Sequence, residues 1–259
     1  MQKSTHLYLI LGAILIFGIG FGTSSLLTQA TQDPTPLQEL SIEESTEKEV
    51  KTVQEPIMRE QNEKEDQFSG FDLVSDTSLQ RFLSDNHPFS DPQYIPEDLA
   101  PIESDFTTNA ARKFQLRKEA GIAFADMARH FWNDFKGKKK FTITSAYRSF
   151  GHQEHLHQHY CRKDQCAEPG SSEHQAGLAL DLGQNGKRLD QASIQRLQKN
   201  AHRWGFHQTY QKGPDIDGKM TEPWHWRYLG NELATELHEK KLSFTEWFYI
   251  QQIEDHLSE

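Results

Sequence analysis

The sequence predicts an α+β fold for residues 68–259. Amphipathic helical segments and short strand-like segments are mixed along this region, without the regular alternation that accompanies a parallel sheet. Hydrophobic residues make up only 35% of the 259 residues, which is low for a globular chain. Part of the sequence is therefore expected to lie outside any core.

The first half of the domain divides into irregular chain, a long helix and a strand. Four prolines between residues 88 and 101 predict irregular chain through Ile102. A helix is expected from Asn109 to Phe135, because apolar residues recur there three and four positions apart. These residues are Phe114, Ala120, Phe124, Met127, Ala128, Phe131 and Phe135. Alternation of polar and apolar residues over Lys140–Thr144 predicts a half-buried strand.

The second half contains shorter elements. We expect a helix over Ser149–Tyr160 and a strand over Leu178–Leu182. Asp190 is a suitable N-cap for a helix with one apolar face that ends at Gly205. The remaining expected elements are strands at 206–210 and 224–228, and helices at 231–240 and 243–256.

The N-terminus carries an uncharged apolar run, Leu7–Leu27, after Lys3. About 20 helical residues cross a bilayer core of roughly 30 Å, so residues 1–30 are expected to form a retained signal anchor and transmembrane segment. A signal peptide cleaved near Ala30 is the alternative. The charges on either side predict a cytoplasmic N-terminus and export of the remainder in both cases.

Residues 31–67 have the composition of a disordered acidic linker. Eleven acidic and four basic residues give this stretch a net charge of −7, out of −10 for the chain, and it has no aromatic residue. Such a segment cannot bury enough apolar surface to offset its ordering entropy, so it is expected to act as a solvated spacer. The acidic balance also offers no electrostatic surface for nucleic acid.

Two short stretches carry the residues for metal chemistry. One runs from Ser172 to Asp181 and the other from Glu222 to His225. A catalytic zinc needs three protein ligands and one position for water, and His174, Asp181 and His225 can supply imidazole and carboxylate ligands. This donor set suits zinc better than calcium or magnesium, which prefer oxygen ligands.

Glu222 lies three residues before His225 and is the candidate general base. At that spacing its carboxylate can face the same metal without being a ligand, and can accept the proton of an activated water. Taken singly, each of these residues is more often structural, with the histidines hydrogen-bonded and Asp181 capping a turn before Gly183. The prediction of a hydrolase depends on the three candidate ligands and Glu222 occurring together.

The same residues carry a family resemblance. The segments Ser145–Ser149, Ser172–Asp181, Trp204–Phe206 and Glu222–His225, with Gln153, resemble the VanY-type D-alanyl-D-alanine carboxypeptidases, which are LAS-type zinc metallopeptidases. The resemblance extends from about Pro88 to about Trp247. It implies a single zinc-peptidase domain in which a small, mainly antiparallel sheet is flanked by helices. It also implies a bacterial enzyme outside the cytoplasm.

The resemblance assigns further roles. It implies zinc ligation by His174, Asp181 and His225, Glu222 as catalytic base, and Arg148 over the substrate, where it stabilises the developing oxyanion. Gln153 and Ser172 match positions that line the peptide-binding cleft. The substrate class would be a peptidoglycan stem peptide. D,D-carboxypeptidase, L,D-carboxypeptidase and endopeptidase specificities stay open, as does a non-catalytic wall-binding module with the same fold.

Two other groups leave alternatives open. The histidines at 152, 155, 157 and 159 form either a second metal site or a polar helix near the cleft. Cys161 and Cys166 are either joined in a disulfide in an oxidising exterior or free as thiols. The loop Tyr210–Thr221, which contains three glycine or proline residues, is expected to help close the cleft.

Overall fold

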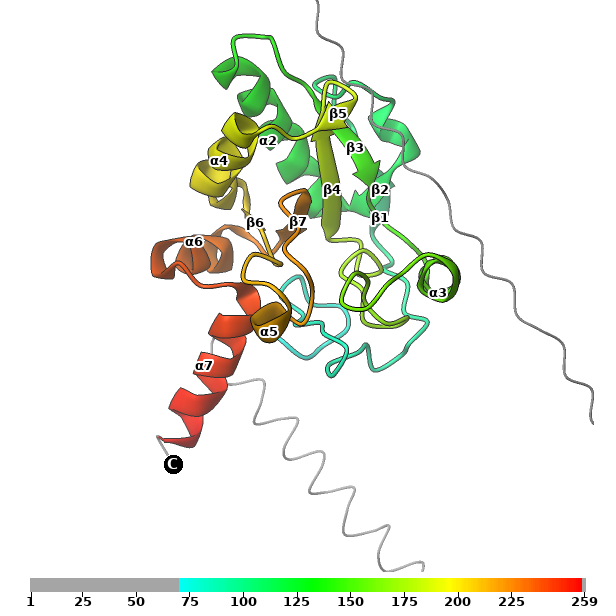
Figure 1. Ribbon diagram of the computed structural model, residues 1–259, viewed down its shortest axis with the longest axis vertical. Helices are drawn as coiled ribbons and strands as arrows, with labels where there is room; N and C mark the ends of the chain where they lie inside the picture. The colour runs from blue at the N-terminus through cyan, green and yellow to red at the C-terminus, as the bar shows by residue number, and fades with distance from the viewer. Residues whose placement is uncertain (1–69, 258–259) are drawn as a thin grey trace, which may run out of the picture. The chain divides into compact units, whose positions relative to one another are not determined.

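The computed structural model describes residues 70–257 (Figure 1). The elements of this part of the chain are, in order, β1 (Leu99–Pro101), η1 (Ala111–Lys113), β2 (Gln115–Arg117), α2 (Lys118–Asp134), β3 (Phe141–Ser145), α3 (Phe150–His159), β4 (Ala179–Gln184), β5 (Lys187–Arg188), α4 (Gln191–Asn200), η2 (Ala201–Trp204), β6 (Phe206–His207), α5 (Pro214–Asp217), β7 (His225–Tyr228), α6 (Asn231–Lys240) and α7 (Phe244–His256).

The main sheet is antiparallel and places the site at its centre. Its strand order is β3-β4-β7-β6, and β5 pairs with β4 as a hairpin. Asp181 on β4 lies opposite Ser145 on β3 and His225 on β7. A separate ladder joins β1 to β2. Helices and small antiparallel sheets are thus combined as the α+β prediction requires.

The main core lies between α2 and the sheet. On α2 the buried residues include Phe124, Met127 and Phe131, which repeat at helical spacing, as predicted. Phe131 stacks on Phe141 of β3 with ring centroids 4.0 Å apart. Each such buried side chain contributes about 1.5–3 kcal/mol through apolar surface removed from water, so this contact fixes the sheet that carries the site.

A second core holds the C-terminal helices. Leu233 and Leu237 of α6 and Trp247 of α7 are fully buried there, together with Phe82 from the irregular N-terminal segment. Phe82 stacks on Phe248 at 3.8 Å between ring centroids. The segment predicted as irregular chain therefore packs against the end of the domain and contributes to its core.

Two predicted boundaries were wrong. The helix expected from Asn109 begins at Lys118, because residues 115–117 pair with β1. The strand expected at 206–210 contains only Phe206 and His207 in the ladder. The short elements β1, β5 and α5 were not expected, because each depends on a partner or a turn that local periodicity does not encode. The predicted end at Gly205 is confirmed: this residue has φ 75°, and a Cβ would approach Tyr228 to 2.6 Å.

The expected anchor at 1–30 and the acidic linker at 31–67 lie outside the described residues. Between residues 70 and 257, no helix has the length and apolar character that a bilayer crossing requires.

Candidate metal and catalytic site

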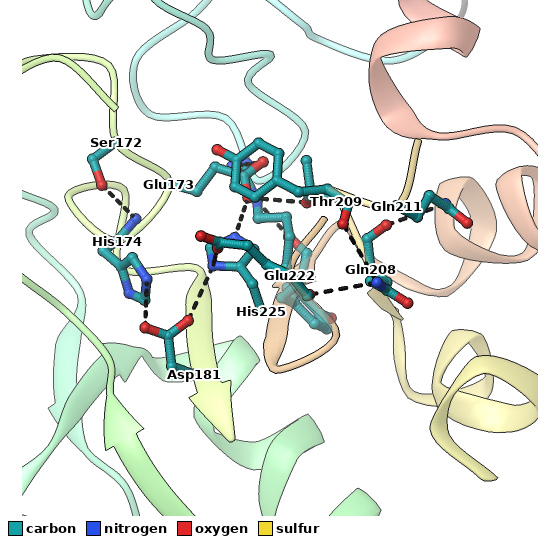
Figure 2. Close-up of polar contacts among 12 residues, drawn as sticks. Ser172, Glu173, His174, Asp181, Gln208, Thr209, Gln211, Glu222 and His225 are labelled. Carbon is teal, nitrogen blue, oxygen red and sulfur yellow. Dashed lines mark hydrogen bonds and ion pairs between the residues drawn. The ribbon is translucent and has the colours of Figure 1, made fainter. Parts of the chain in front are cut away.

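Three side chains from different parts of the fold converge on one point. His174 lies in the loop that precedes β4, Asp181 lies on β4, and His225 begins β7. One possible ligand atom from each lies within 4.8 Å of those of the other two. Figure 2 shows Asp181 between the two imidazoles. The structure thus brings together the three residues that the sequence predicts as one group, and their role as metal ligands stays a prediction.

His174 is held with one ring nitrogen facing Asp181. Its Nδ1 lies 2.8 Å from the carbonyl oxygen of Ala146, which can only accept, so Nδ1 carries the proton. Nε2 then has a free lone pair and lies 3.4 Å from Asp181 Oδ2. The backbone N–H of His174 donates to Ser172 Oγ at 3.3 Å, which fixes the loop.

His225 is oriented in the same way by a buried carboxylate. Its Nε2 donates to Glu173 Oε2 at 2.7 Å, and its Nδ1 lies 3.2 Å from Asp181 Oδ1. Metal-binding histidines characteristically donate their second N–H to a carboxylate or carbonyl, which fixes the tautomer. Both histidines have this arrangement, so the atoms that face Asp181 are the ones that can bind a metal.

The charges around His225 favour a cation. Burial lowers the pKa of His225, but hydrogen bonds to Asp181 and Glu173 raise it to about 10. The same carboxylates that stabilise a proton on this ring would stabilise a divalent cation placed between His174, Asp181 and His225. The three residues can therefore hold a divalent metal ion.

Glu222 lies beside this group without belonging to it. Its Oε2 is 3.9 Å from His225 Nδ1, and its backbone N–H donates to the carbonyl of Tyr210 at 2.9 Å. Burial raises the pKa of Glu222 to about 7, and the negative charges of Asp181 and Glu173 add to the rise. A carboxylate with a pKa near neutrality has the range expected of a general acid or base.

Arg148 and Tyr210 complete the polar surroundings. Burial lowers the pKa of Arg148, whereas the charges of Asp181 and Glu222 raise it. Its Nε is buried without a hydrogen-bond partner in the described part of the chain. The ring of Tyr210 packs 4.8 Å from that of His225. Burial, with Glu173 next in effect, raises the pKa of Tyr210 well above its usual value, so its hydroxyl stays a donor at neutral pH.

Sequence analysis missed the carboxylate that supports His225. Glu173 is 1% exposed, accepts a hydrogen bond from Thr209 Oγ1 at 2.9 Å, and lies 3.5 Å from Arg227 Nη1. Arg227 is itself completely buried in β7. Two features of the sequence could have indicated this carboxylate. Glu173 is the direct neighbour of the candidate ligand His174, and Arg227 is a charged residue inside a predicted strand, where it needs a partner of opposite charge.

The two residues expected at the cleft are both buried. Ser172 is 2% exposed and bonds the His174 backbone, and Gln153 is fully buried and donates to the carbonyl of Ala167 at 2.6 Å. Both therefore have a structural partner next to the site. Their assignment to peptide binding stays a prediction.

The histidine group and the cysteines lie on and after α3. His155 and His159 have ring centroids 4.4 Å apart, whereas His157 lies 3.4 Å from a carboxylate oxygen of Glu168. Among the described residues, only His174, Asp181 and His225 form a group of three suitable metal ligands. Cys161 and Cys166 are joined in a disulfide.

Part of the chain is similar to proteins of a known family. Residues 113–231 match the VanY family model, described as D-alanyl-D-alanine carboxypeptidase. The putative carboxypeptidase YodJ of Bacillus subtilis (strain 168) is 32% identical over 175 residues, which are 60% of this chain and 62% of the relative. A D-alanyl-D-alanine carboxypeptidase of Enterococcus faecalis (strain ATCC 700802 / V583) is 40% identical over 88 residues, 33% of each chain.

A solved structure supports the same assignment. The structure of the LdcB LD-carboxypeptidase matches with a TM-score of 0.57 and 29% identity, over 67% of this chain and 87% of that chain. The chain spans less than two thirds of the length of the two curated relatives. Residues 113–231 thus match the VanY family, and the relatives and the LdcB structure support this assignment for the described domain.

Proposed function

We propose that this chain is a zinc-dependent carboxypeptidase that hydrolyses the terminal peptide bond of peptidoglycan stem peptides of the D-Ala-D-Ala type. The observation that carries the proposal is the convergence of His174, Asp181 and His225 with Glu222 beside them. The match to the family model supports the reaction class. A non-catalytic wall-binding module would not need a carboxylate placed beside a complete set of three candidate metal ligands.

The donor set fits zinc. Two imidazoles and one carboxylate are a usual catalytic zinc set, in which the fourth position stays open. Each imidazole already has its second nitrogen engaged, with Ala146 for His174 and with Glu173 for His225. A zinc ion bound there would supply Lewis-acid activation of water and of the scissile carbonyl.

The chain's own residues then move the proton and stabilise charge. Glu222 accepts a proton from the attacking water and returns it to the leaving amine, which a pKa of about 7 allows in both directions. Arg148 has an unpartnered buried N–H and lies within the electrostatic reach of Asp181 and Glu222. Its guanidinium would stabilise the negative charge that develops on the carbonyl oxygen.

An L,D-carboxypeptidase is the second candidate. The match to the LdcB LD-carboxypeptidase structure, with a TM-score of 0.57, favours it. The two specificities share the site chemistry and differ in the stereochemistry of the residue before the scissile bond. The walls of the cleft, which contact that residue, therefore decide between D,D and L,D specificity.

The test uses the full chain, loaded with zinc, and synthetic pentapeptide and tetrapeptide stems. Mass spectrometry is expected to detect release of one terminal alanine from the pentapeptide for D,D specificity, or from the tetrapeptide for L,D specificity. Glu222→Gln is expected to lower turnover about 10²–10⁴-fold. The matched control Glu232→Gln changes an exposed acid on α6 and is expected to keep full activity. No alanine released from either stem by the zinc-loaded chain would contradict the proposal.

We also propose that residues 1–30 anchor the enzyme in the bacterial membrane, with the catalytic domain outside the cytoplasm. The support is the uncharged run Leu7–Leu27, which has the length of a membrane-spanning helix. Cell fractionation and the intact mass of the purified protein test this. A mass that lacks about 30 residues, with the protein in the medium, would instead indicate a cleaved signal peptide.

A further inference from the structure

A cavity of about 550 Å³ adjoins the metal-site residues and has no role in the chemistry described above. It begins at Asp181 and follows β4 past Gly183 to the hairpin that β4 forms with β5. Thr142 and Thr144 on the neighbouring strand β3 line it as well. The cavity therefore extends from the ligand Asp181 along the sheet. We call it the β4 groove.

The walls of the β4 groove are mainly apolar. Its apolar lining includes Pro223, Trp224, Leu189 and Ile194. Trp224 is 38% exposed although it is among the largest apolar side chains of the domain. An exposed tryptophan between the catalytic Glu222 and the ligand His225 is well placed to pack against a bound chain. Apolar walls of this kind bind the aliphatic body of a ligand.

Two basic residues form the far end of the groove. Lys187 and Arg188 make up β5, both are exposed, and neither has an ion-pair partner among residues 70–257. The nearby carboxylate of Asp190 is already engaged by Lys139 at 2.7 Å. The groove thus combines apolar walls with two uncompensated positive charges, which is complementary to a ligand with an aliphatic body and an anionic group.

These bases lie on the opposite side of Asp181 from Arg148. The pairing of β3 with β4 places Ser145 opposite Asp181 and Thr142 opposite Gly183. Arg148 follows Ser145 along the chain, whereas Arg188 lies opposite Gly183. Figure 1 accordingly shows β5 at one end of β4 and α3, which follows Arg148, beyond the other. The site has a cation at each end, with the metal ligands between them.

This arrangement gives the direction of a bound peptide. A carboxypeptidase substrate has only one residue after the scissile bond, so the longer groove must take the part before it. Arg188 lies opposite a residue two positions along β4 from Asp181, and Lys187 lies opposite one three positions along. At roughly 3.3 Å per extended residue, the bases are about two to three peptide residues from the metal ligands.

We infer that the β4 groove binds the amino-terminal part of the substrate peptide and selects a carboxylate two or three residues before the scissile bond. The inference rests on the proposed peptidase function and names the substrate class for that site. Trp224 packs against the peptide, and Lys187 and Arg188 pair with its carboxylate. A peptide in which this carboxylate is amidated is bound less well.

The test compares two peptides that differ only in this carboxylate, free in one and amidated in the other. Calorimetry with the zinc-loaded full chain carrying Glu222→Gln measures their binding without turnover, and steady-state kinetics with the unsubstituted chain measures KM and kcat. The free carboxylate is expected to bind about five- to tenfold more tightly, as two partly exposed ion pairs would give. The double variant Lys187→Gln/Arg188→Gln is expected to lose this preference, with KM for the free-carboxylate peptide raised to that of the amidated one.

Lys199→Gln supplies the matched control, because it removes one exposed positive charge on α4 outside the groove. It is expected to leave the preference intact. Equal binding of the two peptides, or a preference that survives the double variant, would overturn the inference. Failure of the proposed function is separate: the unsubstituted chain would then hydrolyse neither peptide, while the calorimetric comparison would still decide the role of the groove.

Discussion

At the scale of single residues, Glu173 connects the candidate metal site to the buried interior. Its carboxylate accepts hydrogen bonds from His225 and Thr209 and faces Arg227. All four residues are buried, and Glu173 itself is 1% exposed. A buried carboxylate in this position does two things: it fixes the ring orientation of His225, and it compensates the charge of Arg227. Metal affinity and folding stability are therefore linked through one side chain.

Replacement of Glu173 by Ala is expected to weaken zinc binding about 10–100-fold, because His225 loses the partner that fixes its tautomer. It is also expected to lower the free energy of unfolding by about 3 kcal/mol, since Arg227 keeps a buried charge without its carboxylate. Competition with a chelating dye measures the first and urea unfolding the second. Thr209→Val removes another bond to Glu173 but leaves His225 paired, so it should retain most of the zinc affinity. Unchanged zinc affinity in Glu173→Ala would contradict this role.

His207 makes stability depend on pH. Burial lowers the pKa of this ring to about 4, from 6.5 in an unfolded chain. Between these values the unfolded chain binds a proton that the folded chain does not, so stability falls as the pH falls from 6.5 to 4. The loss from this residue is up to about 3 kcal/mol. Urea unfolding of the metal-free protein across this range should show a shallower decline for His207→Gln. If the unfolding free energy declined equally steeply with pH in His207→Gln and in the unsubstituted protein, another group would be responsible.

At the scale of elements, the sequence was most informative where a pattern is local. The buried face of α2 follows from helical spacing, and the end at Gly205 follows from a residue that tolerates positive φ. The start of α2 could not be predicted, because the pairing of residues 115–117 with β1 is a contact between segments with separate local patterns. Similarly, the three candidate ligands have recognisable spacing, whereas the burial of Glu173 depends on the whole fold.

Replacement by alanine is expected to have opposite effects on stability at two glycines in different elements. Gly183 lies in the β4–β5 hairpin, where an added Cβ would approach the carbonyl oxygen of Lys187 to 2.4 Å. Gly183→Ala is expected to displace the hairpin and cost about 1–3 kcal/mol of unfolding free energy. Gly121 lies inside α2 with no atom within 4 Å of an added Cβ, so Gly121→Ala is expected to stabilise by about 0.5–1 kcal/mol. Thermal unfolding measures both variants. If both raised or both lowered the melting temperature, the expected difference between the two positions would be contradicted.

At the scale of the whole molecule, the segment that leads to Glu222 is held by distant parts of the chain. Lys219, which is buried, forms an ion pair with the exposed Asp85 of the irregular N-terminal segment. Met220 N–H donates at 2.8 Å to the carbonyl of Asp164, inside the loop closed by the disulfide. These contacts set the position of the 210–221 loop, which leads directly into Glu222, while the metal ligands lie outside this loop. The expected role of the loop in closing the cleft stays a prediction.

This separation predicts different effects on turnover and on metal binding. Lys219→Met keeps the aliphatic bulk but removes the charge that pairs with Asp85, so the loop loses an anchor three residues before Glu222. We expect kcat to fall several-fold, because small displacements of a catalytic group are costly, and zinc affinity to stay unchanged. Asp85→Asn should act through the same contact. The double variant Asp85→Asn/Lys219→Met should therefore lose less unfolding free energy than the sum of the two single variants, and this difference, the coupling energy, should be about 0.5–3 kcal/mol. Additive losses, or a parallel loss of zinc affinity, would mean that the ion pair does not position the loop.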